Sequence, residues 1–168
     1  MNIVTISGSA RPESSNKELL MHLSSLTSKL KFHHSTLLDD LPLFRYEPES
    51  NQLPKIVKEW RKEIEAADGV IICIPEYIHN MPALIKNALE WLASSGELVG
   101  KKVLAITLTP HSPRGEKAMQ SLLWSLTALD ANIIASLSLY KNEISYSSED
   151  VIFGDGAEVL TEALNLFI

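Results

Sequence analysis

The stretch Val70-Ile71-Ile72-Cys73-Ile74-Pro75-Glu76-Tyr77 joins an unbroken apolar run to a polar loop. Continuous apolar runs of this length are typical of strands that are covered on both faces, as in parallel sheets. Residues 80–93 follow with the apolar spacing of an amphipathic helix. We expect Asn80 to cap this helix and Pro82 to lie in its first turn. The stretch therefore predicts a strand, a loop and a helix in succession.

The same alternation continues on both sides of this stretch. Strand patterns occupy residues 3–6, 103–108 and 133–139, with a weaker one over 32–38, and helix patterns occupy residues 16–30, 53–67, 116–129 and 157–167. Five such units predict an α/β fold, a three-layer sandwich with helices on both faces of a parallel sheet. We expect one domain over residues 1–168 and a five-stranded sheet in the order 2-1-3-4-5. Ligands of such sheets bind beyond the carboxyl ends of strands 1 and 3, where the order reverses. Residues 39–51 and 140–150 are expected to be irregular.

The composition excludes several classes of protein. The chain has 168 residues, 15 basic and 21 acidic, for a net charge of −6, which provides no basic footprint for nucleic acid. Its one cysteine excludes an intrachain disulfide, and no Cys-His spacing fits a metal site. No apolar run reaches the ~18–20 residues of a membrane span, and the first residues lack the pattern of a signal peptide. We therefore expect a cytoplasmic protein with neither a metal nor a membrane partner.

The loop after the first strand, residues 7–16, carries four serines, Arg11 and Asn16 at the entry to a helix. It lacks the three glycines of a dinucleotide turn and the Gly-Lys-Ser/Thr of a P-loop. Hydroxyls and a guanidinium suit phosphate oxygens, so the loop favours a terminal monophosphate. The alternative is an ordinary polar loop whose serines cap the helix and whose arginine is solvated.

Two motifs carry a resemblance to a known family. The pattern Gly8-Ser9-x-Arg11-x-x-Ser14-x-Asn16 resembles the phosphate loop of the NADPH-dependent FMN reductase-like flavoproteins. Residues 75–91, from Pro75-Glu76-Tyr77 to Lys86-Asn87-Ala88-Leu89-Glu90-Trp91, resemble a second family segment, and Asp40-Leu41-Pro42-Leu43 and Gly100-Lys101 are weaker echoes. The resemblance implies a flavodoxin-like fold that binds FMN, with NADPH or NADH as electron donor.

The resemblance also implies the cofactor-binding residues and an assembly. The phosphate would be held by Ser9, Arg11, Ser14, Ser15 and Asn16, the flavin ring would lie along Pro75, Glu76, Tyr77, Ile78 and His79, and the loop after the fourth strand, with Thr109, His111 and Ser112, would close the other side. Members of the family are usually homodimers, sometimes tetramers. Trp91 lies where their subunits commonly meet.

Two positions depart from the family pattern. The family often has Asn-Gly after the tyrosine, where this chain has Ile78-His79, and a glycine lets the backbone approach a flat ring. The loop Thr109–Gly115 has one glycine and two prolines where the family is usually rich in glycine. Both departures bear on substrate choice and on FMN affinity.

Single residues of these loops leave alternatives open. Glu76 either accepts from a flavin N–H or caps the following helix, and Arg114 either meets the extra phosphate of NADPH or is solvated. His79 and His111 are either close to the flavin or surface residues without a role. Cys73 is expected to be a small apolar core residue, and the helical spacing of Trp60, Trp91 and Trp124 indicates packing.

The resemblance implies an FMN-dependent NAD(P)H oxidoreductase that reduces small acceptors such as quinones, azo compounds, free flavin or metal oxyanions. Because the flavin carries the redox chemistry, we assign no catalytic side chain and expect ping-pong kinetics. The alternatives are a flavodoxin-type electron carrier and a binding or regulatory module of the same fold that has lost FMN.

Overall fold

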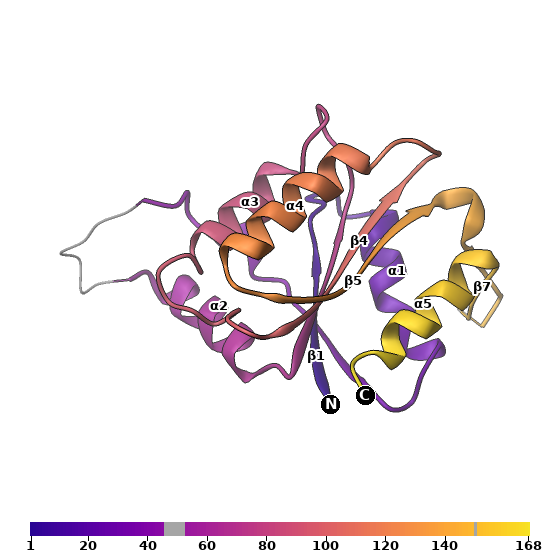
Figure 1. The fold of residues 1–168 in the computed structure, drawn as a ribbon, viewed down its shortest axis with the longest axis horizontal. Helices are drawn as coiled ribbons and strands as arrows, with labels where there is room; N and C mark the ends of the chain where they lie inside the picture. Colours follow the sequence, from indigo (N-terminus) through magenta and orange to yellow (C-terminus); the bar gives the residue numbers. More distant parts are fainter. Residues whose placement is uncertain (46–52, 150) are drawn as a thin grey trace.

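A five-stranded parallel sheet forms the centre of the molecule (Figure 1). The computed structural model describes residues 1–45, 53–149 and 151–168. The sheet has the order β2-β1-β3-β4-β5, and every neighbouring pair in it is parallel. This confirms the predicted fold class and strand order. Its strands are β1 (Asn2–Ser7), β2 (Lys31–His34), β3 (Gly69–Ile74), β4 (Lys102–Thr109) and β5 (Asn132–Tyr140).

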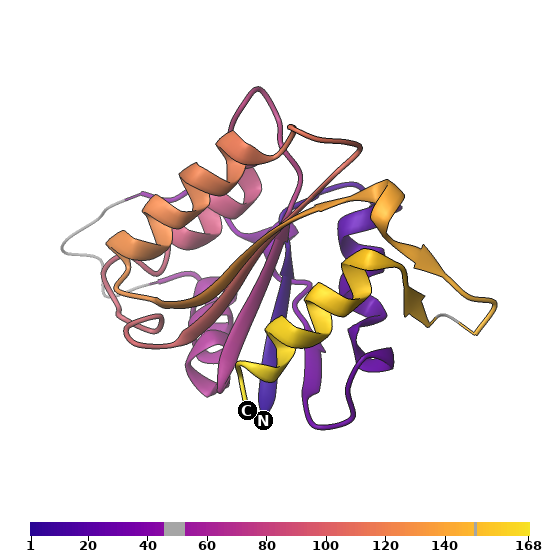
Figure 2. The same cartoon turned by 45° about the vertical axis from the view of Figure 1, so that its right-hand side comes forward.

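Helices cover both faces of the sheet (Figures 1 and 2). Helices α1 (Ser15–Met21) and α5 (Asp155–Asn165) lie on one face, and α2 (Lys55–Ala66), α3 (Ala83–Glu90) and α4 (Glu116–Ala128) lie on the other. Alternate residues of β3 point to the two layers: Val70 and Ile72 join the core under α2, α3 and α4, whereas Ile71 and Cys73 join the core under α1 and α5. The whole of β3 is buried, which is why its sequence is apolar without alternation.

The first predicted helix and the second predicted strand are shorter than expected. Helix α1 ends at Met21 instead of residue 30, and a 3-10 turn, η1 (Leu23–Ser25), follows. The Ser25 hydroxyl donates to His22 O at 2.8 Å, a local bond that competes with helical pairing. Strand β2 ends at His34 because the chain then turns, with Leu37 N donating to the Ser35 hydroxyl, into the 3-10 turn η2 (Leu38–Asp40).

Two further expectations about helices are wrong. Helix α3 begins at Ala83 with Pro82 as its N-cap, and the Asn80 side chain accepts instead from Met81 N at 2.8 Å. Trp60 and Trp91 are buried as expected, but Trp124 is 67% exposed, so it does not pack in the core.

The segment after η2 is fastened to α3. The Asn87 side chain accepts from Phe44 N at 2.7 Å and donates to Pro42 O at 3.0 Å. The Trp91 indole N–H donates to the same Pro42 carbonyl at 2.8 Å, and its ring meets the Phe44 ring edge-on at 5.1 Å. We call residues 41–44 with Asn87 and Trp91 the clasp. The remainder of the predicted 39–51 loop, from residue 46 on, lies outside the described residues.

The segment after β5 is not wholly irregular. A 3-10 turn, η3 (Lys141–Glu143), leads into a small antiparallel pair formed by β6 (Ser145–Tyr146) and β7 (Ile152–Phe153), which project from the domain beside α5 (Figure 2). Residue 150, at the end of the predicted loop, lies outside the described residues.

Candidate functional site

A cleft of about 310 Å³ opens above the carboxyl ends of β1, β3 and β4. The sheet brings these ends together because Ser7 pairs with Cys73 and Cys73 with Ile106. This is the crevice that the strand order predicts. The cleft is lined by Ser9, Arg11, Glu13, Ser14, Ser15, Asn16, Pro75, Glu76, Tyr77, Leu108, Thr109, Pro110, Arg114 and Lys141.

Most of the predicted cofactor residues therefore share one cleft. The four that are not in its lining are Ile78, His79, His111 and Ser112, all of which are exposed. Conversely, Lys141 lines the cleft although it lies in η3 and its segment showed no motif. Only the pairing of β4 with β5, which brings the end of β5 to this edge of the sheet, places Lys141 there.

Two serines of the first loop are buried and keep their hydroxyl hydrogens available. The Ser9 hydroxyl oxygen accepts from Arg11 N at 3.4 Å, and the Ser14 oxygen caps α1 by accepting from Asn16 N at 3.2 Å. A serine hydroxyl still has a hydrogen to donate when its oxygen accepts. The capping alternative is thus correct for Ser14, and it leaves the O–H of both serines able to meet an anion in the cleft.

Asn16 is held in one orientation by a thiol. Its side chain is buried, and its Oδ1 accepts from the Cys73 Sγ at 3.2 Å. Burial raises the pKa of the Cys73 thiol far above its ordinary value, so the thiol keeps the hydrogen that it donates. With Oδ1 engaged, the amide NH₂ is the end of Asn16 that a ligand in the cleft would meet. Cys73 is a core residue as expected, and this orienting contact is the part that the sequence did not reveal.

Glu76 connects the two walls of the cleft. One of its carboxylate oxygens accepts from Lys117 N and from Ala118 N, each at 3.1 Å, so it caps α4. A capping role was one of the alternatives expected for Glu76, but for the following helix, α3. The other oxygen lies 3.6 Å from His79 Nδ1. The backbone N-cap of α4 is Gly115, whose φ of 103° and close approach to Thr107 leave no room for a side chain.

The departure at Ile78-His79 forms a tight, strained turn. Tyr77 and Asn80 exchange two backbone hydrogen bonds of 3.0 Å across it. The two central residues have φ values of 51° and 55°, the left-handed region that type I′ turns require. Asn-Gly is the favoured pair in such turns, and a β-branched residue is a rare occupant. The chain therefore forms the type of turn that Asn-Gly favours, but with Ile78 and His79, which adopt positive φ less readily.

The loop after β4 forms a further wall of the cleft, in addition to the loops after β1 and β3. The buried Thr109 hydroxyl donates to Arg114 O at 2.9 Å and closes the loop across its base. Pro110 and the exposed Arg114 border the cleft, while His111 Nδ1 lies 3.0 Å from Ser112 O on the outer side. In the part of the chain that the structure describes, no cluster of three or more His, Cys, Asp or Glu side chains could hold a metal ion. Within the same residues, no helix is both long and apolar enough to cross a membrane.

A family model described as NADPH-dependent FMN reductase matches residues 1–144. The chain belongs to the NADPH-dependent FMN reductase family. The match ends at the start of the β6–β7 pair, so it includes every residue that lines the cleft. The resemblance drawn from the two motifs is confirmed.

Individual relatives in this family support the same placement. The chain is 29% identical over 165 residues to the NADH:(hydroxy)cinnamate reductase subunit CrdA of Vibrio ruber, covering 96% of this chain and 79% of that one. It is 32% identical over 143 residues to a 2-hydroxy-1,4-benzoquinone reductase of a Burkholderia species, covering 83% and 78%. Among solved structures, the flavoenzyme NAD(P)H:(acceptor) oxidoreductase FerB of Paracoccus denitrificans superposes with a TM-score of 0.80 at 23% identity, covering 99% and 94%; it supports the fold.

The donor set of the cleft fits the cofactor of this family. A phosphate monoester needs several hydrogen-bond donors and positive charge at one end. The first loop offers the Ser9 and Ser14 hydroxyls, the Asn16 amide and the Arg11 guanidinium to the cleft. Tyr77 and Pro110 offer flat apolar surface from the loops after β3 and β4. The volume lies at the lower end of the ~300–1,000 Å³ usual for small-molecule sites.

Proposed function

We propose that this cleft binds FMN and that the protein is an NAD(P)H-dependent oxidoreductase that reduces small electron acceptors. The observation that carries the proposal is the convergence of the first loop with Tyr77 and the loop after β4 on one cleft at the predicted crevice. In this assignment, Ser9, Arg11, Ser14, Ser15 and Asn16 hold the phosphate. Pro75, Glu76 and Tyr77 lie along the ring, and Thr109 closes the opposite wall.

The side chains of the cleft bind and orient rather than exchange protons. FMN supplies the redox chemistry, since a bound flavin accepts a hydride and passes on one or two electrons. Arg114 and Lys141 line the cleft and provide positive charge for the phosphates of the electron donor, with Arg114 proposed to meet the extra phosphate of NADPH. As the resemblance to the family implies, we propose that donor and acceptor use the cleft in turn, with ping-pong kinetics.

We propose that the acceptors are quinones, azo compounds, free flavin or metal oxyanions. The named relatives support an oxygen-bearing organic acceptor, since one is a reductase of a hydroxybenzoquinone and another a subunit of a (hydroxy)cinnamate reductase. Ile78, His79, His111 and Ser112 are proposed to contact the ring or the acceptor from the rim of the cleft. We further propose a cytoplasmic homodimer, or a tetramer, which analytical ultracentrifugation would distinguish from a monomer.

An FMN titration tests the cofactor site. The expected result is a saturable change in flavin absorbance on binding, followed by bleaching of the flavin within seconds of adding NADPH without oxygen. Slow bleaching with tight binding would favour an electron carrier, and no binding would refute the proposal.

A matched pair of variants tests the phosphate loop. Losing a charge-assisted hydrogen bond costs about 1.5–3 kcal/mol, so Arg11→Ala should weaken FMN binding roughly 10- to 150-fold. Arg45→Ala removes an exposed arginine that does not line the cleft and should leave FMN binding unchanged. Equal affinities for the two variants would refute the assignment of Arg11.

A further inference from the structure

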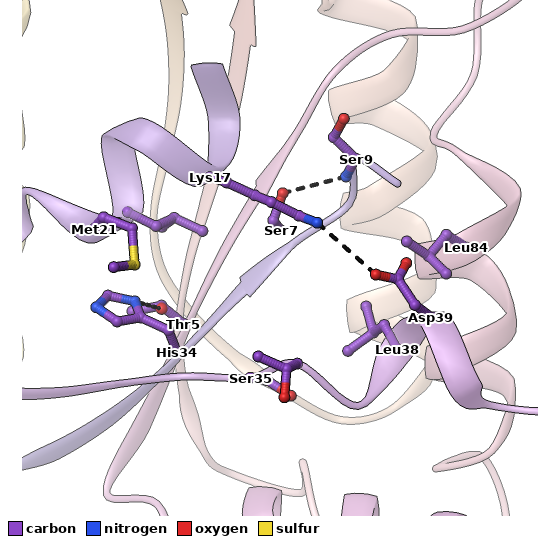
Figure 3. Close-up of a pocket in the computed structure, with 12 residues that line it drawn as sticks. Thr5, Ser7, Ser9, Lys17, Met21, His34, Ser35, Leu38, Asp39 and Leu84 are labelled. Carbon is purple, nitrogen blue, oxygen red and sulfur yellow. Dashed lines mark hydrogen bonds and ion pairs between the residues drawn. The ribbon is translucent and has the colours of Figure 1, made fainter. Parts of the chain in front are cut away.

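A second pocket of about 160 Å³ lies over the carboxyl ends of β1 and β2 (Figure 3). The flavin cleft lies over β1, β3 and β4, so the two spaces are on opposite sides of β1 and share Ser9. The pocket's floor is formed by Thr5 and Ser7 of β1 and by His34 of β2. Neither motif of the sequence analysis points to this space.

The walls of the pocket are apolar and come from three elements. Leu20 and Met21 belong to α1, Leu38 to η2 and Leu84 to the first turn of α3. The clasp fixes the chain that follows η2 against α3, so the wall opposite α1 is held in place. An apolar cavity of about 150 Å³ accepts a benzene ring, whereas larger ligands need at least about 300 Å³. This pocket therefore has room for a single six-membered ring.

The floor and rim add hydroxyl groups whose hydrogens are left to donate. The Ser7 oxygen accepts from Ser9 N at 3.3 Å, and the Ser35 oxygen accepts from Leu37 N at 3.5 Å. Each hydroxyl keeps one hydrogen for a further acceptor. The matching ligand atoms are oxygens attached to the ring.

The charges of the pocket compensate one another. Lys17 Nζ lies 3.8 Å from Asp39 Oδ2, and the pair extends across the space in Figure 3. Burial lowers the pKa of His34, whose Nδ1 lies 2.6 Å from the Thr5 hydroxyl, so its imidazole is neutral at neutral pH. A pocket without net charge favours a neutral ligand over a carboxylate or phosphate.

We propose that this pocket binds a neutral six-membered aromatic ring with oxygen substituents, a phenol or hydroquinone, while FMN occupies the separate cleft. The proposal that a ring binds in this pocket is supported by the lining residues alone and does not depend on the proposed function. The simultaneous occupancy rests on the proposed function, because it assumes that FMN lies on the other side of the first loop.

The first experiment measures hydroquinone binding to flavin-depleted protein, without oxygen, by ligand-observed NMR. For a ligand this small, a dissociation constant of about 1 mM is expected. Leu84→Trp places an indole in the pocket and should weaken binding at least tenfold, whereas Leu166→Trp, at a half-exposed leucine after α5 that does not line the pocket, should not change it. Equal binding by Leu84→Trp and the natural protein would overturn the proposal.

A milder substitution covers the case in which Leu84→Trp does not fold. Removing one neutral hydrogen bond costs about 0.5–1.5 kcal/mol, so Ser35→Ala should weaken hydroquinone binding roughly 2- to 12-fold. Ser138→Ala, at an exposed serine of β5 on the far edge of the sheet, is the matched control. Unchanged binding by Ser35→Ala would overturn the assignment of the polar rim.

Repeating the measurement with FMN-saturated protein separates the two sites. A dissociation constant within twofold of the flavin-depleted value is expected. Displacement of hydroquinone by FMN would show that the ring binds in the cleft, and would overturn the proposal. Failure of FMN to bind would refute the proposed function instead, and would leave the comparison of Leu84→Trp with Leu166→Trp intact.

Discussion

Replacing Ile78-His79 with Asn-Gly should stabilise the protein. Each non-glycine residue held at positive φ costs about 1–3 kcal/mol, and a β-branched residue lies at the upper end of this range. Asparagine tolerates the left-handed region, and glycine removes the strain but loses about 0.5–1 kcal/mol to chain entropy. Ile78 is 98% exposed, so its replacement loses no buried apolar surface. The His79 side chain is 86% exposed, so its 3.6 Å contact with Glu76 contributes little.

The net gain for the double variant is about 1–3 kcal/mol. For a chain of 168 residues this corresponds to a rise in melting temperature of roughly 2–12 °C. The assay is thermal and urea unfolding of flavin-depleted protein, so that cofactor affinity does not contribute. Val99→Asn exchanges another exposed β-branched residue, one whose φ is not positive, and should give no gain. An unchanged or lowered melting temperature for the double variant would refute the strain at this turn.

Three further predictions concern the residues that support the cleft and the second pocket. Asn87→Ala removes two of the three side-chain hydrogen bonds of the clasp and should lower the free energy of unfolding by about 1–3 kcal/mol in urea titrations; a change below about 0.5 kcal/mol would contradict this role. Glu76→Ala uncaps α4 and should cost about 0.5–2 kcal/mol, whereas Glu116→Ala, which changes an exposed residue of the same turn, should cost less. Because burial lowers the pKa of His34 below its ordinary 6.5, the unfolded chain binds the proton more readily, and stability should fall as the pH drops below about 6.5. Urea midpoints at pH 7.5 and 5.5 should therefore differ more for the natural protein than for His34→Gln.

The strand order and the position of the cleft could be predicted because they follow from periodicity. Buried parallel strands and amphipathic helices leave strong patterns, and the topology then determines which strand ends meet. Boundaries were harder to predict where polar side chains compete with the backbone. Ser25, after Met21, and Ser35, after His34, end their helix and strand through local hydrogen bonds that apolar spacing does not reveal.

Contacts between distant segments were outside the reach of the sequence. Glu76 could be recognised as an acceptor, but its partners at residues 117 and 118 depend on how the loop after β3 packs against α4. By contrast, the exposure of Trp124 could have been predicted from the geometry of its helix. It lies two positions after the buried Leu122, or about 200° around the helix, which points it away from the sheet.

The clasp indicates that the family motif carrying Asn87 and Trp91 has a structural role. Asn87 and Trp91 belong to one of the two segments that resemble the family, yet both use their polar atoms to fasten residues 42–44 rather than to meet a ligand. A protein could therefore retain this motif for the sake of its architecture after losing the ability to bind flavin. Conversely, an active reductase could lose the motif if another contact held that segment. Searches for active members of this fold are then better weighted toward the loop at residues 9–16 than toward the helix that carries the motif.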